Sequence, residues 1–188
     1  MHSFIDGDDD VAAPRRRRRA LIMWVLCVLV LIGPSLLVWA VRGVAFAYHC
    51  TPGPDLCHGM PLGGGLRDTL NLAWFAGVNT TLTLAIALVA AVAGLCERKP
   101  LMAALSIIVL PLAALLLPTL AVLMSGYDGC KISESGVGDC TLWGGKMGMA
   151  FHTAAQTTGL VYDFMPYAVS LSLMLGLVGF LFLRPKRN

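Results

Sequence analysis

Four long apolar stretches constrain this chain more than any other feature. They cover residues 20–41, 70–95, 101–124 and 159–183, and the first three contain no charged residue. A bilayer core of about 30 Å needs about 20 helical residues at about 1.5 Å each, so every stretch is long enough to cross it. Membrane-spanning strands need alternating polarity, which these stretches lack. The sequence therefore predicts an all-α membrane protein built as a bundle of four transmembrane helices.

Composition agrees with this fold class. Hydrophobic residues make up 57% of the 188 residues and charged residues 13%. Soluble domains average about 45–50% apolar and about 25% charged residues. The composition therefore disfavours a cytosolic α/β enzyme and a nucleic-acid-binding protein, and it makes the lipid bilayer the first expected partner.

The basic residues are distributed unequally between the two sides of the predicted membrane domain. In a four-span arrangement, ten of the 14 lysines and arginines lie on the side of the two termini, and only four lie on the other: Arg42, Arg67, Lys131 and Lys146. Because cytoplasmic loops of membrane proteins carry the excess of Lys and Arg, both termini are predicted to be cytoplasmic. The run Arg15 to Arg19 is interpreted as an anchor for this orientation and not as a nucleic-acid site.

This orientation divides the chain into two parts. Residues 1–19 form an expected disordered cytoplasmic tail, and residues 20–188 form the membrane domain. The segments 43–69 and 125–158 are expected to be loops that face outward. The expected location is a bacterial inner membrane.

The cysteines are also distributed unequally, and most of them lie on the outward side. Four of the six lie in the two expected outward loops: Cys50, Cys57, Cys130 and Cys140. The outward side of such a membrane is oxidising, which favours two structural disulfides. The simplest pairing is Cys50 with Cys57 and Cys130 with Cys140, although four cysteines allow three connectivities.

Histidine and methionine side chains near these cysteines suggest a second possibility. The candidate ligands for an outward-facing metal site are His49, His58, Met147, Met149 and His152. Imidazole and thioether groups are ligands that suit copper or zinc. However, Cys50 and Cys57 lack the short spacing of a structural zinc site. Metal handling or transport is therefore the third hypothesis, behind the two that follow.

The layout also resembles the bacterial quinone-linked oxidoreductases that generate disulfides. The resemblance covers four spans, a cytoplasmic N-terminus and one cysteine pair in each outward loop, Cys50 with Cys57 and Cys130 with Cys140. It implies that both pairs would relay electrons from a periplasmic thiol protein to a quinone. The first pair of that family is a C-x-x-C, whereas Cys50 and Cys57 have six residues between them, and a short spacing is what activates such a disulfide.

Polar and small residues in the second span point to helix packing. Gly77, Thr81 and Ala85 recur every four residues, which predicts a face that lets helices approach closely. Asn79 lies between them, about 14 Å into the span at about 1.5 Å per residue, and is expected to hydrogen-bond between helices. Asp163 is the only charged residue within the four stretches, which disfavours ion transport.

These patterns favour a non-catalytic role. The sequence predicts a small membrane subunit or accessory protein that presents disulfide-stapled outward loops to a membrane or periplasmic protein partner. No catalytic residue and no cofactor are expected. The alternative is the thiol–quinone oxidoreductase, in which the four loop cysteines would be catalytic and quinone would be the cofactor.

Overall fold

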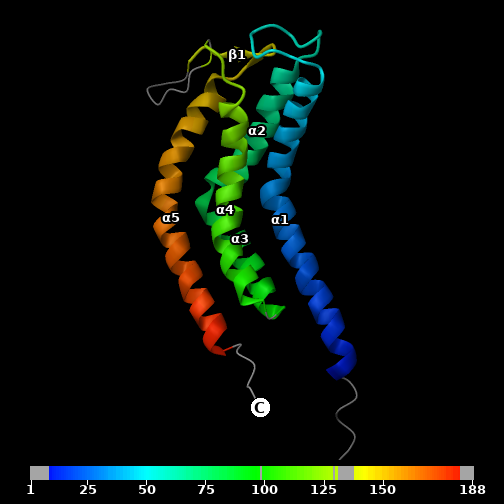
Figure 1. The fold of residues 1–188 in the computed structure, drawn as a ribbon, viewed down its shortest axis with the longest axis vertical. Coiled ribbons are helices and arrows are strands. Elements are labelled where there is room, and N and C mark those ends of the chain that lie inside the picture. The colour runs from blue at the N-terminus through cyan, green and yellow to red at the C-terminus, as the bar shows by residue number, and fades with distance from the viewer. Residues whose placement is uncertain (1–8, 98, 129, 131–137, 183–188) are drawn as a thin grey trace, which may run out of the picture.

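The computed structural model of the chain is mostly helical and is described for residues 9–97, 99–128, 130 and 138–182. Its elements are α1 (Asp9–Ala47), α2 (Leu62–Val78), α3 (Thr80–Cys96), α4 (Pro100–Leu123), β1 (Thr141–Leu142), β2 (Gly145–Lys146) and α5 (Gly148–Phe182). Figure 1 shows the helices along the long axis, with the α1–α2 loop, the α4–α5 connection and the small sheet together at one end. We call this the loop end. The opposite end, where α1 begins, is the arginine end.

Several helices are long and apolar enough to span a membrane. Among the described residues these are Arg17–Ala47, Pro100–Leu123 and Gly148–Val178, and the bent pair Leu62–Phe75 and Thr80–Cys96 makes a fourth if it counts as one span. Such helices are what an integral membrane protein requires. Of the predicted stretches, 101–124 matches its helix most closely, since α4 covers Pro100–Leu123.

The second predicted span is not one straight helix. Residues 70–95 were expected to form a single span, but the chain bends by 69° between Leu62–Phe75 and Thr80–Cys96. The reason lies in Asn79, whose side-chain oxygen accepts a hydrogen bond from Leu82 N at 3.2 Å and caps the first turn of α3. Asparagine is among the preferred N-cap residues because its short side chain reaches the free N–H groups of the next turn. The side chain thus starts a new helix instead of bonding between helices.

Helices α1, α2 and α5 begin earlier in the chain than the predicted spans. Helices α1 and α5 are longer than their apolar stretches, because α1 includes residues 9–19 and α5 begins at Gly148, and α2 begins at Leu62, ahead of the predicted start of the second span. The loops are therefore shorter than 43–69 and 125–158. Arginine is a good helix former, so the basic run continues α1 where a tail was expected. Residues 1–8 of that expected tail lie outside the described residues.

Small residues hold α3 against α4. The buried residues of α3 include Ala87, Ala90, Ala91 and Gly94, which follow helical spacing. A Cβ atom at Gly94 would lie 3.0 Å from the backbone nitrogen of Ala103 on α4, so this position needs glycine. The close approach of these two helices comes from this row of residues. It does not come from the predicted face, since Thr81 and Ala85 are exposed.

Gly77, the third residue of the predicted face, contacts a different helix. A Cβ atom at Gly77 would lie 2.9 Å from the carbonyl oxygen of Ala114 on α4. Ala114 is four residues before Pro118, which has no N–H to donate to that carbonyl. The bend at Asn79 therefore separates the predicted face: Gly77 packs against α4 from α2, while Thr81 and Ala85 lie beyond the break.

Candidate functional site

Two disulfides close the loops at the loop end. Cys50 bonds to Cys57 with their Cα atoms 5.5 Å apart, and Cys130 bonds to Cys140 with theirs 5.0 Å apart. This is the simplest of the three pairings that the sequence allowed. Cys57, Cys130 and Cys140 are only 4%, 4% and 6% exposed, so the two bridges are largely covered by the surrounding chain.

The two loops are joined by hydrogen bonds from the backbone and the indole of Trp143. Its backbone N–H donates to Gly53 O at 2.8 Å, and its indole N–H donates to Thr51 O at 3.0 Å. Its carbonyl in turn accepts from Gly63 N at 3.1 Å. Gly144 N also donates to Pro54 O at 3.1 Å. The segment between β1 and β2 is thus held by the first loop on one side and by the start of α2 on the other.

Two glycines, Gly63 and Gly145, allow the start of α2 to lie close to the turn between β1 and β2. A Cβ atom at Gly63 would collide with the carbonyl oxygen of Leu142 and would lie 2.6 Å from Gly145 N. A Cβ atom at Gly145 would meet the backbone of Gly63 and lie 2.7 Å from Gly64 N. Only residues without a side chain permit two backbones to lie this close, so the contact depends on glycine on both sides.

Three bulky residues of the loop end hold left-handed backbone conformations. Among the described residues, the non-glycine positions with positive φ are His49 (52°), His58 (48°) and Trp143 (47°). Left-handed φ is uncommon for residues with a bulky side chain, and such strained positions gather at functional sites. All three therefore mark the loop end as the candidate site.

Each of these three left-handed conformations has a local structural cause. His49 follows the last turn of α1: its N–H donates to Phe46 O at 3.0 Å, and Cys50 N donates to Ala45 O at 2.9 Å. This is the Schellman arrangement, in which the residue after the helix is left-handed and is usually glycine. His58 and Trp143 each precede a glycine of positive φ, Gly59 (78°) and Gly144 (75°), as in type I′ turns.

The same three residues line one pocket. This cavity of about 290 Å³ at the loop end is lined by His49, Cys50, Thr51, Gly53, Asp55, Leu56, Cys57, His58 and Trp143. Asp55 and the two histidines supply polar groups, and the Cys50–Cys57 bridge forms part of the wall. His58 Nε2 lies 3.0 Å from the carbonyl oxygen of Tyr48 and donates to it, which leaves Nδ1 as the acceptor of the neutral ring. The pocket offers hydrogen-bonding groups to a small polar or cationic group.

The predicted metal ligands do not come together as one set. His49 and His58 line the pocket, but Met147 is buried in the core beneath the loops, and Met149 is exposed. His152 Nε2 lies 3.0 Å from Gln156 Nε2, one turn further along α5. Within the part of the chain that the structure describes, no three His, Cys, Asp or Glu side chains form a group that could hold a metal ion.

Sequence reasoning missed Trp143 and Asp55 as site residues. The available signal was a pair of two-residue turns, His58-Gly59 and Trp143-Gly144, each with glycine second. Glycine at that position is typical of hairpin turns.

Comparison of the chain with protein-family models, with curated proteins and with solved structures finds no match.

Proposed function

We propose that this protein is a small membrane subunit or accessory protein whose loop end is a docking site for a protein partner. In this proposal both termini are cytoplasmic, the loop end faces outward from a bacterial inner membrane, and the partner is a membrane or periplasmic protein. The observation that carries the proposal is that all three strained, non-glycine positions of the described chain line one pocket. Strain of this kind costs about 1–3 kcal/mol per residue and persists only where the surroundings hold it.

The construction of the pocket supports this role. Two disulfides and the hydrogen bonds of Trp143 keep its walls in place before anything binds. A preformed surface loses less conformational entropy on association than a flexible one. Leu56 (53% exposed) and Tyr48, also exposed, offer apolar surface at or near the rim, and interfaces favour such side chains beside a polar pocket. A volume of about 290 Å³ suits one side chain of a partner.

Site-specific photo-crosslinking in native membranes tests the proposal. A photoreactive amino acid replaces Leu56 at the rim of the pocket, and the matched control replaces Met149, which is 64% exposed but does not line it. We expect a discrete crosslinked product from position 56 and none from position 149. The variant Asp55→Ala should reduce the yield at position 56. Equal yields at the two positions, or none at either, would contradict the proposal.

Burial weighs against the thiol–quinone oxidoreductase. Thiol–disulfide exchange requires a thiolate to reach a disulfide sulfur, and three of the four bridged cysteines are at most 6% exposed. A double substitution of each pair by serine separates the two functions. Structural bridges predict a loss of stability of roughly 2.5–2.8 kcal/mol for each pair. Unchanged stability, together with quinone reduction by a dithiol donor that the substitutions abolish, would instead favour the oxidoreductase.

A further inference from the structure

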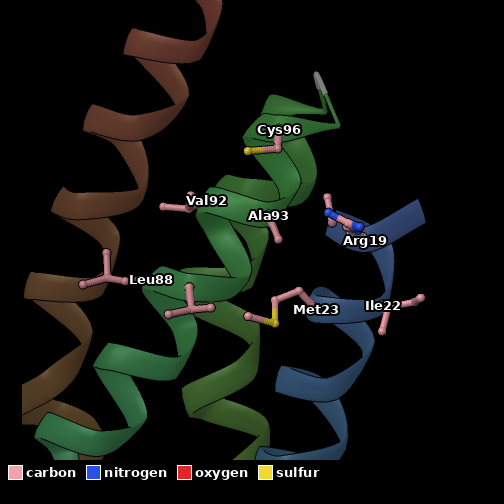
Figure 2. Close-up of a pocket in the computed structure, with 9 residues that line it drawn as sticks. Arg19, Ile22, Met23, Leu88, Val92, Ala93 and Cys96 are labelled. Carbon is pink, nitrogen blue, oxygen red and sulfur yellow. The ribbon is translucent and has the colours of Figure 1, made fainter. Parts of the chain in front are cut away.

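An apolar groove lies between α1 and α3 at the arginine end. It has a volume of about 680 Å³, and its walls include Met23 of α1 and Leu88, Val92 and Ala93 of α3. Figure 2 shows Met23 extending from α1 toward α3, with Arg19 one turn closer to the start of α1, at the same end as Cys96. Helix α1 includes a segment long and apolar enough to span a membrane, and α3 is half of the bent pair that makes a fourth span if it is counted as one. Lipid chains therefore have access to it.

The groove combines an apolar wall with a cationic end. Arg19 lines it directly, and Arg17 and Arg18 precede Arg19 as exposed residues of the same helix. Beyond Cys96, Glu97 and Lys99 carry opposite charges, so the arginines determine the sign of this end. An acyl chain and an anionic headgroup have the same division between an apolar and a charged part.

A second groove, between α1 and α4, provides a comparison. It has a volume of about 410 Å³, and the residues that line it include Trp24, Val28, Leu105 and Val109. None of its lining residues is charged, since the polar side chains there are Ser106 and Trp24, which hydrogen-bond to each other at 3.0 Å. Both grooves suit hydrocarbon, but only the groove with Arg19 also offers a partner for an anion.

We propose that the groove between α1 and α3 binds an anionic phospholipid from the leaflet at the arginine end. One acyl chain lies along Leu88, Val92 and Met23, and the phosphate accepts hydrogen bonds from the guanidinium of Arg19. Guanidinium binds phosphate through two parallel hydrogen bonds, which gives geometric specificity as well as charge. Arg17 and Arg18 add to the general attraction for an anionic surface, which falls off within a Debye length of the membrane. This proposal does not rest on the proposed function of the loop end.

Native mass spectrometry of the full-length protein in detergent tests the headgroup. Phosphatidylglycerol and phosphatidylcholine with identical acyl chains are titrated against the parent protein, Arg19→Gln and Arg17→Gln. We expect tighter binding of phosphatidylglycerol, a loss of about tenfold in its affinity for Arg19→Gln, and a smaller loss for Arg17→Gln. Both variants lose the same charge, so equal losses would mean diffuse attraction and overturn the site. Equal affinity for the two lipids in the parent protein would also overturn it.

A second pair of variants tests the acyl-chain part. Val92→Trp fills the groove that contains Arg19, and Val109→Trp fills the uncharged groove. The two valines are 58% and 49% exposed, so both proteins should fold with the larger side chain on the surface. Val92→Trp should lower the affinity for phosphatidylglycerol, and Val109→Trp should leave it unchanged. An unchanged affinity in Val92→Trp would contradict the proposed position of the lipid chain.

Discussion

Arg42 of α1 donates a hydrogen bond from its guanidinium to the backbone carbonyl of Ala121, near the end of α4, at 3.0 Å. Its second terminal nitrogen donates to Met124 O at 3.1 Å. The last carbonyls of a helix have no backbone partner within the helix, and Ala121 O here accepts from both Arg42 and the Ser125 hydroxyl, the latter at 2.7 Å. A cation at this end also complements the helix dipole. Arg42 is one of the four basic residues that the charge pattern places on the outward side. Its contacts with α4 explain why a cation lies there.

The substitution Arg42→Gln should destabilise the protein. Hydrogen bonds to charged groups contribute about 1.5–3 kcal/mol each, and Arg42 makes two of them to α4. Arg42→Lys should have an intermediate effect, because lysine keeps the charge but lacks the planar fork. The free energy of unfolding in detergent measures both. The control is Arg67→Gln, since Arg67 is exposed and pairs with Asp68 at the surface, where such pairs contribute at most about 1 kcal/mol. A similar loss in both glutamine variants would contradict this role of Arg42.

Neighbouring glycines at the start of α2 should differ sharply in their tolerance of alanine. At Gly63 a Cβ atom would collide with the Leu142 carbonyl, whereas at Gly64 it would meet nothing within 4 Å. Gly63→Ala should therefore cost about 1–3 kcal/mol or more and expose Trp143, which its fluorescence reports. Gly64→Ala should be neutral or stabilise the helix by about 0.5–1 kcal/mol. Equal effects of the two substitutions would mean that the loops do not interlock at this point.

The break at Asn79 should depend on its capping side chain. Asn79→Leu should lower the free energy of unfolding by about 1 kcal/mol, because the first turn of α3 loses its side-chain acceptor. Asn79→Ser should retain most of the stability, since serine caps about as well as asparagine. Asn71→Leu is the matched control because Asn71 lies exposed within α2. If Asn79→Leu is as stable as the parent protein, the side chain of Asn79 does not stabilise the start of α3 and the bend has another cause.

The left-handed backbone conformation of His49 should lower the stability of the folded protein by a measurable amount. His49→Gly should stabilise the protein by about 1 kcal/mol, because glycine is the favoured residue after a helix that ends in this way. Ala47→Gly, two residues earlier and still within α1, should destabilise it by about 1 kcal/mol. If the pocket binds a partner, His49→Gly should also lower the crosslinking yield at position 56. A more stable protein with an unchanged yield would remove His49 from the docking site.

The apolar pattern predicted some elements better than others. The stretch 101–124 agrees with α4 within a residue at each end because an uninterrupted apolar run ends there in a short connection and in a loop. The run 70–95 also contains no charged residue, yet one asparagine divides it. Hydropathy averages over a window and does not register a single cap, so a bend of this kind escapes it.

The candidate site was predicted in part. The observed cysteine pairing is the simplest of the three that the sequence left open, and it joins residues seven and ten positions apart within one loop each. The roles of His49 and His58 did not follow, since an imidazole near a cysteine suggests a ligand, whereas both histidines here take up left-handed backbone positions. Trp143 was not expected at all in the site, because the Thr51, Gly53 and Pro54 carbonyls that its turn contacts lie about 90 residues away in the chain.

The sequence alone determined the properties that depend on composition and order. These are the helical class, the apolar segments long enough to cross a membrane, the asymmetry of charge and the grouping of four cysteines in two loops. The tertiary structure alone decided which surfaces meet: Gly63 against Gly145, Gly77 against Ala114, and Arg42 against the last carbonyls of α4. Membrane spans follow from the transfer of apolar side chains out of water, which each segment undergoes by itself. Close backbone approach depends on two segments at once, and its cause is visible only when both are in place.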